Sequence, residues 1–191
     1  MEIELLSAVR PAYISATPAG PTWPCQVPVT ASAWVKPGDS VCVTMLTMNG
    51  ASDCVELPWG QIDPVTEELD FLVWSTGQGF ARRCLVPVAQ VRQSCDAEGA
   101  SGWVAYKPRY GGNFAGVWVL DNPHGFRPMA FKLLTVPAGR DLSPYCTRQP
   151  ILIPPEGCAN WLNPSVSTAR LQQAPPVGTF DVLEFDEVAP A

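Results

Sequence analysis

The sequence predicts a single α+β domain over residues 1–191, mostly antiparallel sheet curled into a partial barrel, with a few short helices packed outside. A chain of 191 residues suits one domain with one core. The 21 prolines are scattered along the chain and form no repeat, and because each one removes a backbone donor they exclude long helices. Between the prolines lie short runs rich in β-branched and aromatic residues, which are typical of strands.

Two antiparallel pairs are the clearest strand predictions. Apolar runs on either side of Asn49 and Gly50 predict a hairpin, because Asn-Gly supplies the positive φ values of a two-residue turn. A second pair flanks the turn residues at 122–125. Further short strands are predicted at 102–110 and 149–154. The carboxyl-terminal residues 178–188 alternate apolar and acidic side chains, which predicts a last edge strand whose charges oppose pairing with another chain.

Helices are predicted to be few and short. The four segments with helical spacing or helix-start signals are 65–74, 88–95, 155–162 and 165–173. In the third of these, Pro155 stands near the first turn, where its missing N–H costs nothing. Strands are therefore expected to outnumber helices.

Membrane-spanning and secreted classes are not favoured. No run of about 18 apolar residues is present, which excludes a transmembrane protein. Glu2 and Glu4 stand where a secretory signal carries positive charge, and no small-residue cleavage site follows an apolar core. The expected location is the cytoplasm, with no membrane partner.

Metal and cofactor sites are not predicted. The seven cysteines form no C-x-x-C pair, and His124 is the one histidine, placed in a proline-glycine turn typical of the surface. Most of the cysteines are expected to be reduced and buried. Gly111, Gly112 and Asn113 lack the following lysine and helix of a phosphate-binding loop. The cysteines are Cys25, Cys42, Cys54, Cys84, Cys95, Cys146 and Cys158.

Charge is unevenly distributed along this acidic chain. The net charge of −6 opposes nonspecific coating of nucleic acid, yet residues 82–148 hold nine cations and four acids, mostly arginine among the cations. These arginines either form a local anion site or are solvated and paired with the acidic flanks. Exposed aromatic residues beside them would suit stacking on unpaired bases, although tryptophan is also a common core residue. The candidates are Trp59, Trp74, Tyr110, Arg82, Arg83, Arg109 and Arg148.

An ordered series of motifs resembles the SOS-response-associated peptidase family, whose members process abasic sites in single-stranded DNA. The series runs from an arginine-cysteine-leucine strand through a phenylalanine-alanine-glycine strand to an arginine-proline segment that ends in proline-glutamate and tryptophan-leucine. The resemblance covers 34–164 and implies the family fold and single-stranded DNA as a partner. The matching residues are Arg83, Cys84, Leu85, Pro87, Phe114, Ala115, Gly116, Trp118, Leu134, Thr135, Ala138, Arg148, Pro150, Ile151, Leu152, Pro155, Glu156, Trp161 and Leu162.

The chain departs from the family at the positions that the resemblance marks as catalytic. The family has cysteine at position 2, where its exposed amine and thiol trap the sugar aldehyde, and this chain has Glu2, which is expected to prevent removal of Met1. Gln93 stands at the family's helix glutamate and Cys146 at its histidine. The family's asparagine has no clear counterpart near Ser75 and Thr76. A divergent member that binds single-stranded or abasic DNA without the amino-terminal cysteine chemistry is the leading hypothesis.

Two other classes of function remain open from the sequence. The first is an active abasic-site-processing or thiol-dependent enzyme, in which Cys146 becomes a nucleophile because Arg148 lowers its pKa, or in which Cys25 becomes a new terminus after self-cleavage. The second is a protein-interaction module without a nucleic-acid role, which the acidic composition favours. The sequence leaves enzymatic activity undecided.

Overall fold

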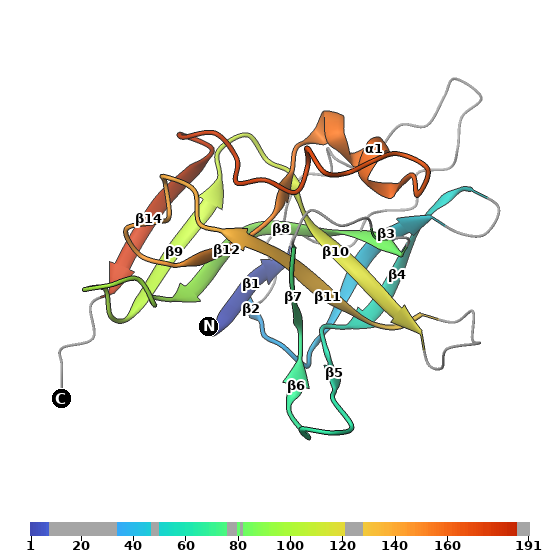
Figure 1. Ribbon diagram of the computed structural model, residues 1–191, viewed down its shortest axis with the longest axis horizontal. Helices are drawn as coiled ribbons and strands as arrows, with labels where there is room; N and C mark the ends of the chain where they lie inside the picture. Colours follow the sequence, from blue (N-terminus) through green and yellow to red (C-terminus); the bar gives the residue numbers. More distant parts are fainter. Residues whose placement is uncertain (8–33, 47–49, 76–79, 81, 121–127, 187–191) are drawn as a thin grey trace.

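Strands dominate the computed structural model, which describes residues 1–7, 34–46, 50–75, 80, 82–120 and 128–186 (Figure 1). The strands are β1 (Ile3–Ser7), β2 (Trp34–Val35), β3 (Ser40–Leu46), β4 (Ser52–Pro58), β5 (Gln61–Ile62), β6 (Leu69–Asp70), β7 (Leu72–Trp74), β8 (Arg83–Ser94), β9 (Trp103–Pro108), β10 (Asn113–Leu120), β11 (Pro128–Pro137), β12 (Arg148–Pro150), β13 (Leu152–Ile153) and β14 (Phe180–Asp186). A 3-10 turn, η1 (Pro155–Gly157), leads into one short helix, α1 (Cys158–Leu162).

The long strand β8 organises the main sheet. Its first half pairs with β3 and β10, and its second half pairs with β1 and β9. Strands β11 and β12 continue the sheet beyond β10, and β14 pairs with β9. The strand pairings are antiparallel except that of β7 with β11. Across the described residues the sheet stays open and does not close into a barrel, so the fold is a strand-rich, mostly antiparallel one.

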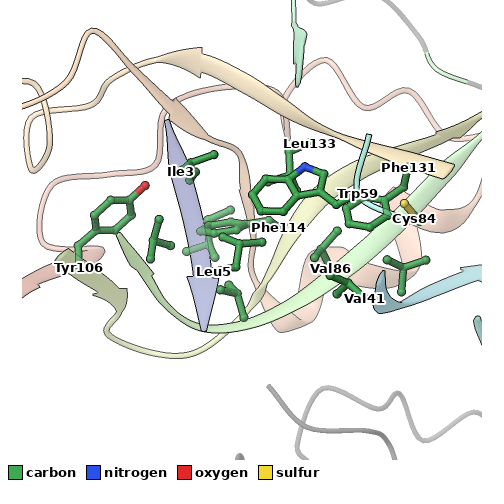
Figure 2. Close-up of a cluster of buried hydrophobic side chains, with 14 of the residues drawn as sticks. Ile3, Leu5, Val41, Trp59, Cys84, Val86, Tyr106, Phe114, Phe131 and Leu133 are labelled. Carbon is green, nitrogen blue, oxygen red and sulfur yellow. The ribbon is translucent and has the colours of Figure 1, made fainter. Parts of the chain in front are cut away.

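Apolar runs in the central strands reflect burial on both faces of the sheet. Along β8, Cys84 and Val86 point into one core with Trp59 and Phe114 (Figure 2), whereas Leu85 points into a second core. The second core lies beneath α1, where the Trp161 Nε1 donates to the Cys84 carbonyl at 2.9 Å. Strands buried on both faces read as continuous apolar segments, which is why these runs lack alternation.

Gly116 is required by the close approach of β10 and β8. It lies opposite Cys84 in the strand register. A Cβ at this position would stand 2.7 Å from the Cys84 Sγ and 3.2 Å from a Val86 methyl, both closer than ordinary contact. The Phe-Ala-Gly and Arg-Cys-Leu motifs of the sequence are therefore two halves of one packing contact.

Both predicted strand pairs form. Strands β3 and β4 pair from Ser40 with Pro58 to Leu46 with Ser52, and the predicted turn at Asn49 falls outside the described residues. Strands β10 and β11 form the second pair, whose predicted turn falls outside the described residues. The acidic carboxyl-terminal strand is β14, which pairs with β9.

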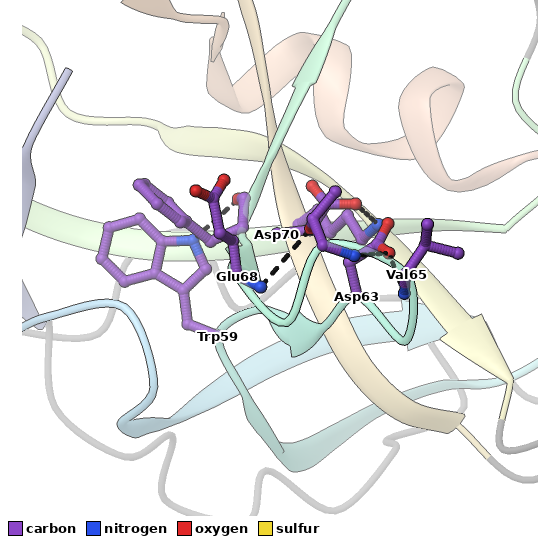
Figure 3. A network of polar contacts seen from close by, with 8 residues as sticks. Trp59, Asp63, Val65, Glu68 and Asp70 are labelled. Atoms are coloured by element: carbon purple, nitrogen blue, oxygen red, sulfur yellow. Dashed lines mark hydrogen bonds and ion pairs between the residues drawn. The ribbon is translucent and has the colours of Figure 1, made fainter.

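Two of the predicted helices are wrong. Segment 88–95 is mostly the second half of β8, in which Val91 and Gln93 are buried and Arg92 is exposed. Segment 65–74 instead holds a turn and strands β6 and β7. The Asp63 carboxylate accepts hydrogen bonds from the Val65 and Thr66 amides at 2.7 and 3.1 Å (Figure 3), which closes a turn rather than a helix.

Of the two carboxyl-terminal helix predictions, one is confirmed and the other is wrong. Segment 155–162 is helical, as η1 followed by α1. Segment 165–173 forms turns and bends rather than a helix. Over the described part of the chain, no helix is long and apolar enough to cross a bilayer.

Candidate functional site

Gln93 is the centre of a buried polar cluster on the inner face of β8. Its side chain has no solvent exposure. The Tyr106 hydroxyl donates to its Oε1 at 2.9 Å. Its Nε2 donates to the Arg148 carbonyl at 2.7 Å and contacts the Met1 Sδ at 3.4 Å. Both ends of the amide are therefore occupied, and the group can neither accept nor release a proton.

The amino terminus lies against this cluster because β1 pairs with the end of β8. Ile3 stands opposite Gln93 in the register. The Glu2 amide donates to the Ser94 Oγ at 2.7 Å, and the Ser94 amide donates to the Glu2 carbonyl at 2.9 Å. The Glu2 side chain itself is exposed. Positions 1 and 2 and Gln93, far apart in sequence, thus share one site.

Cys146 belongs to the same region and is held as a thiol. It is buried, and its Sγ lies 4.0 Å from the Ser94 carbonyl oxygen. Burial, together with the nearby Cys95 and Asp96, raises the pKa of the Cys146 thiol to about 12. A buried neutral thiol is a poor nucleophile. We call Met1, Gln93, Tyr106, Cys146 and Arg148 the Gln93 cluster.

Arg148 connects the Gln93 cluster to the surface. Its guanidinium donates from Nε to the Thr135 Oγ1 at 3.1 Å and from Nη2 to the Thr135 carbonyl at 2.7 Å. The guanidinium carbon lies 4.8 Å from the centre of the Trp74 ring, which is 67% exposed. Desolvation lowers the pKa of Arg148, yet arginine stays charged in proteins. No carboxylate forms an ion pair with Arg148 among the described residues.

Two of the predicted DNA-contacting residues are inside the protein. Trp59 is fully buried, stacks on Phe131 and donates from Nε1 to the Phe71 carbonyl at 3.1 Å (Figures 2 and 3). Arg83 is 5% exposed and donates to backbone carbonyls around α1. Neither side chain is accessible to a ligand, and both are corrected to structural roles.

Two of the remaining central cations are paired with acidic side chains. Arg109 forms an ion pair with Asp181 at 2.6 Å, and Lys132 forms one with Asp70. Asp70 and Asp181 lie in the acidic flanks of the chain, so these two ion pairs are of the kind that one of the sequence interpretations expected. Arg82 is exposed and lies 5.7 Å from the centre of the Trp118 ring. Of the predicted arginines, Arg148 is the one that belongs to the Gln93 cluster.

A further pairing of an exposed arginine with an aromatic ring was missed from the sequence. The Arg92 guanidinium lies 5.3 Å from the centre of the Trp103 ring, and together with Trp34 these residues line a shallow hollow across β2, β8 and β9. Sequence spacing could not reveal it, because the three residues become neighbours only through the pairing of separate strands.

Four candidate positions from the sequence remain, namely Ser75, Thr76, Cys25 and His124. The Ser75 amide donates to the Thr135 carbonyl at 2.9 Å, and its hydroxyl contacts Gln172. Thr76, Cys25 and His124 lie outside the described residues. Within the described ranges, no three histidine, cysteine, aspartate or glutamate side chains are placed to hold a metal ion.

The protonated state of Cys146 predicts a loss of stability at alkaline pH. Its folded pKa of about 12 lies above the ordinary thiol value of 9.0, so the unfolded chain releases a proton that the folded chain keeps. The free energy of unfolding is therefore unaffected below pH 9 and falls between pH 9 and 12, by up to about 1.4 kcal/mol per pH unit for this group. Tyr106, whose pKa burial also raises, adds to the loss.

Urea unfolding at several pH values between 8 and 11 checks this expectation. Cys146→Ala, which removes the titrating thiol, is expected to show a smaller decline than the native chain over the same range. Parallel pH profiles for the two proteins would show that the Cys146 thiol titrates normally.

Comparison with known proteins finds similarity in fold but not in sequence. No protein-family model matches the chain, and no curated protein is significantly similar to it. A protein from Bacteroides thetaiotaomicron has 16% identity over 79% of this chain and 77% of its own, with a TM-score of 0.60. A protein from Bordetella bronchiseptica has 15% identity over 84% and 90%, with a TM-score of 0.61. A phage-related protein from the same bacterium has 19% identity over 84% and 85%, with a TM-score of 0.60.

Proposed function

We propose that this chain is a divergent member of the SOS-response-associated peptidase family that binds single-stranded DNA, including DNA with abasic sites, without forming a covalent bond. The observation that carries the proposal is the pairing of exposed Trp74 with Arg148 directly beside the Gln93 cluster. An aromatic ring offers a stacking platform for an unpaired base, and the guanidinium offers a charge for the adjacent phosphate.

The meeting of sequence-distant positions supports the family assignment. Glu2 and Cys146 both contact Ser94, the neighbour of Gln93, so the three positions that the family resemblance marks as its reaction site lie close together. The motifs that carry the resemblance lie on the neighbouring strands β8, β10, β11 and β12 and continue through β13 and η1 into α1.

The chemistry of the cluster supports binding rather than catalysis. Glu2 replaces the cysteine whose amine and thiol form the family's adduct. Gln93 uses both ends of its amide in hydrogen bonds, so it supplies no proton transfer. Cys146, at the position of the family's histidine, is a buried thiol with a raised pKa. The part of this region that is available for binding is therefore the exposed surface beside these groups.

Fluorescence anisotropy with labelled single-stranded DNA tests the proposal. We expect a micromolar Kd at about 50 mM salt that weakens at least about tenfold at about 200 mM, because phosphate contacts release counterions. Trp74→Ala is expected to weaken binding by about tenfold, the loss of one stacked base. The substitution should not affect folding, since the Trp74 side chain is mostly exposed.

Tyr110→Ala is the matched control. Tyr110 is 78% exposed, and its neighbour Arg109 is already paired with Asp181. We expect its Kd to stay within about twofold of the native value, because the adjacent Arg109 is already paired with an acid. Equal effects of the two substitutions, or no salt-sensitive binding at micromolar protein, would contradict the proposal and favour a protein-interaction role. A DNA adduct that survives denaturation would show that covalent chemistry is retained.

A further inference from the structure

Two cysteine side chains meet on the β3–β4 hairpin, away from the Gln93 cluster. Cys42 lies on β3 and Cys54 on β4, and the register places Thr44 opposite Cys54 and Glu56 opposite Cys42. The two cysteines are thus diagonal neighbours on the same face of the hairpin. Their Sγ atoms are 2.9 Å apart, with the Cys42 thiol donating to the Cys54 sulfur. Both side chains are partly exposed.

We propose that Cys42 and Cys54 form a reversible intrachain disulfide when the protein meets a small-molecule disulfide such as oxidised glutathione. The sulfur atoms need to approach by less than about 1 Å to reach the length of an S–S bond. Side-chain rotation can supply this movement, because the hairpin backbone already holds the two residues on one face. The site is independent of DNA binding.

The surroundings of Cys54 suit it to be the attacking thiol. The hydrogen bond from Cys42 is the main factor that lowers the pKa of the Cys54 thiol, and the Thr44 hydroxyl, 3.9 Å from its Sγ, lowers it further. Partial burial and the neighbouring Asp53 oppose this shift. A lowered pKa increases the fraction of thiolate, which is the reactive form in thiol–disulfide exchange.

The exchange proceeds in two balanced steps. The Cys54 thiolate attacks one sulfur of the small disulfide, forming a mixed disulfide and releasing one small thiol. Cys42 then loses its proton and attacks the Cys54 sulfur, which expels the second small thiol. Two protein thiols are oxidised, one small disulfide is reduced to two thiols, and the protons lost by the protein appear on the released thiols.

The other described cysteines are less suited to this reaction. Cys84, Cys146 and Cys158 are buried, which keeps an oxidant away from them. Cys95 is partly exposed, but burial and the adjacent Asp96 raise the pKa of its thiol. Oxidation is therefore expected to be selective for the hairpin pair.

Peptide mapping after oxidation tests the proposal directly. The full chain is incubated with oxidised glutathione, its remaining thiols are alkylated, and it is cut before aspartate. Cuts before Asp39, Asp53 and Asp63 place Cys42 in peptide 39–52 and Cys54 in peptide 53–62, with Cys25 in neither. We expect these two peptides to be joined, the intact protein to lose two hydrogens, and dithiothreitol to reverse both changes.

Three variants make the test specific. Cys42→Ser is expected to stop at a glutathione mixed disulfide on Cys54, because the second thiol is missing. Cys95→Ser is the matched control and should still form the joined peptides. Oxidation should also raise the Tm of the native chain by several degrees and leave that of Cys54→Ser unchanged, since the cross-link restricts the unfolded chain.

Three results would each overturn the proposal. The first is that the Cys42 and Cys54 thiols stay unmodified in the folded protein. The second is a stable mixed disulfide on Cys54 that never closes in the native chain, and the third is a cross-link that joins either residue to Cys95 or Cys25.

Discussion

Arg83→Met is expected to lower the free energy of unfolding by about 3–5 kcal/mol, the largest loss for any single arginine of the chain. The Arg83 guanidinium is the donor for a group of backbone carbonyls at the end of α1. Its Nη1 lies 3.2 Å from the Trp161 oxygen, 2.8 Å from that of Asn163 and 3.0 Å from that of Val166. Its Nε also donates to the Phe80 carbonyl.

The physical reason is that methionine fills the space but supplies no donor, so the Trp161 and Val166 carbonyls lose this partner, whereas the Asn163 carbonyl keeps the Val166 amide at 3.1 Å. Buried carbonyls that lose a partner carry their full desolvation cost. A cation at the carboxyl end of α1 also interacts favourably with the helix dipole, and the guanidinium lies 5.7 Å from the centre of the Trp161 ring. The segment after α1 is therefore expected to lose its attachment to β8.

Urea unfolding measures the loss, and Arg82→Met is the matched control. Arg82 precedes Arg83 in sequence but is exposed. Its substitution is expected to cost less than about 1 kcal/mol, as for most surface changes. Arg83→Lys keeps the charge without the forked geometry and should fall between the two. Equal losses for Arg82→Met and Arg83→Met would contradict a structural role for Arg83.

Gln93→Glu is expected to lower the free energy of unfolding, and the loss is expected to grow with pH. It should be about 2–3 kcal/mol larger at pH 8 than at pH 5.5. The Arg148 carbonyl at 2.7 Å needs a donor from residue 93, and the Tyr106 hydroxyl at 2.9 Å needs an acceptor. A protonated glutamic acid meets both needs, whereas a carboxylate opposes the Arg148 carbonyl. Burial therefore raises the pKa of the introduced group.

The sign follows from that raised pKa. The unfolded glutamate ionises near pH 4.3, so above that pH the unfolded state releases a proton that the folded state retains, and stability falls as the pH rises toward the folded pKa. Urea unfolding at the two pH values gives the difference. Gln93→Met, which removes both polar contacts without adding a charge, should be destabilised equally at both values. A penalty for Gln93→Glu that does not depend on pH would contradict the hydrogen-bond assignment.

The sequence alone was sufficient for the strand-rich character and for the main antiparallel pairs. Scattered prolines and β-branched runs are local features, and they predict strands wherever tertiary contacts agree with them. The helix prediction for 88–95 was wrong because tertiary contacts there selected one of two structures that the local pattern allowed. Its apolar spacing fits either period, and the pairing of β8 with β1 and β9 selected the strand.

Exposure was the property that only the tertiary structure decided. Arg83 and Arg82 are adjacent and chemically identical, yet one holds buried carbonyls and the other is exposed. Trp59 and Trp74 likewise divide between core and surface. Alternation along a strand sends neighbouring side chains to opposite faces, and which face is covered depends on elements distant in sequence. The sequence by itself therefore determined the type, order and spacing of the residues. The contacts of Met1 with Gln93 and of Trp74 with Arg148 formed only because strands distant in sequence pair.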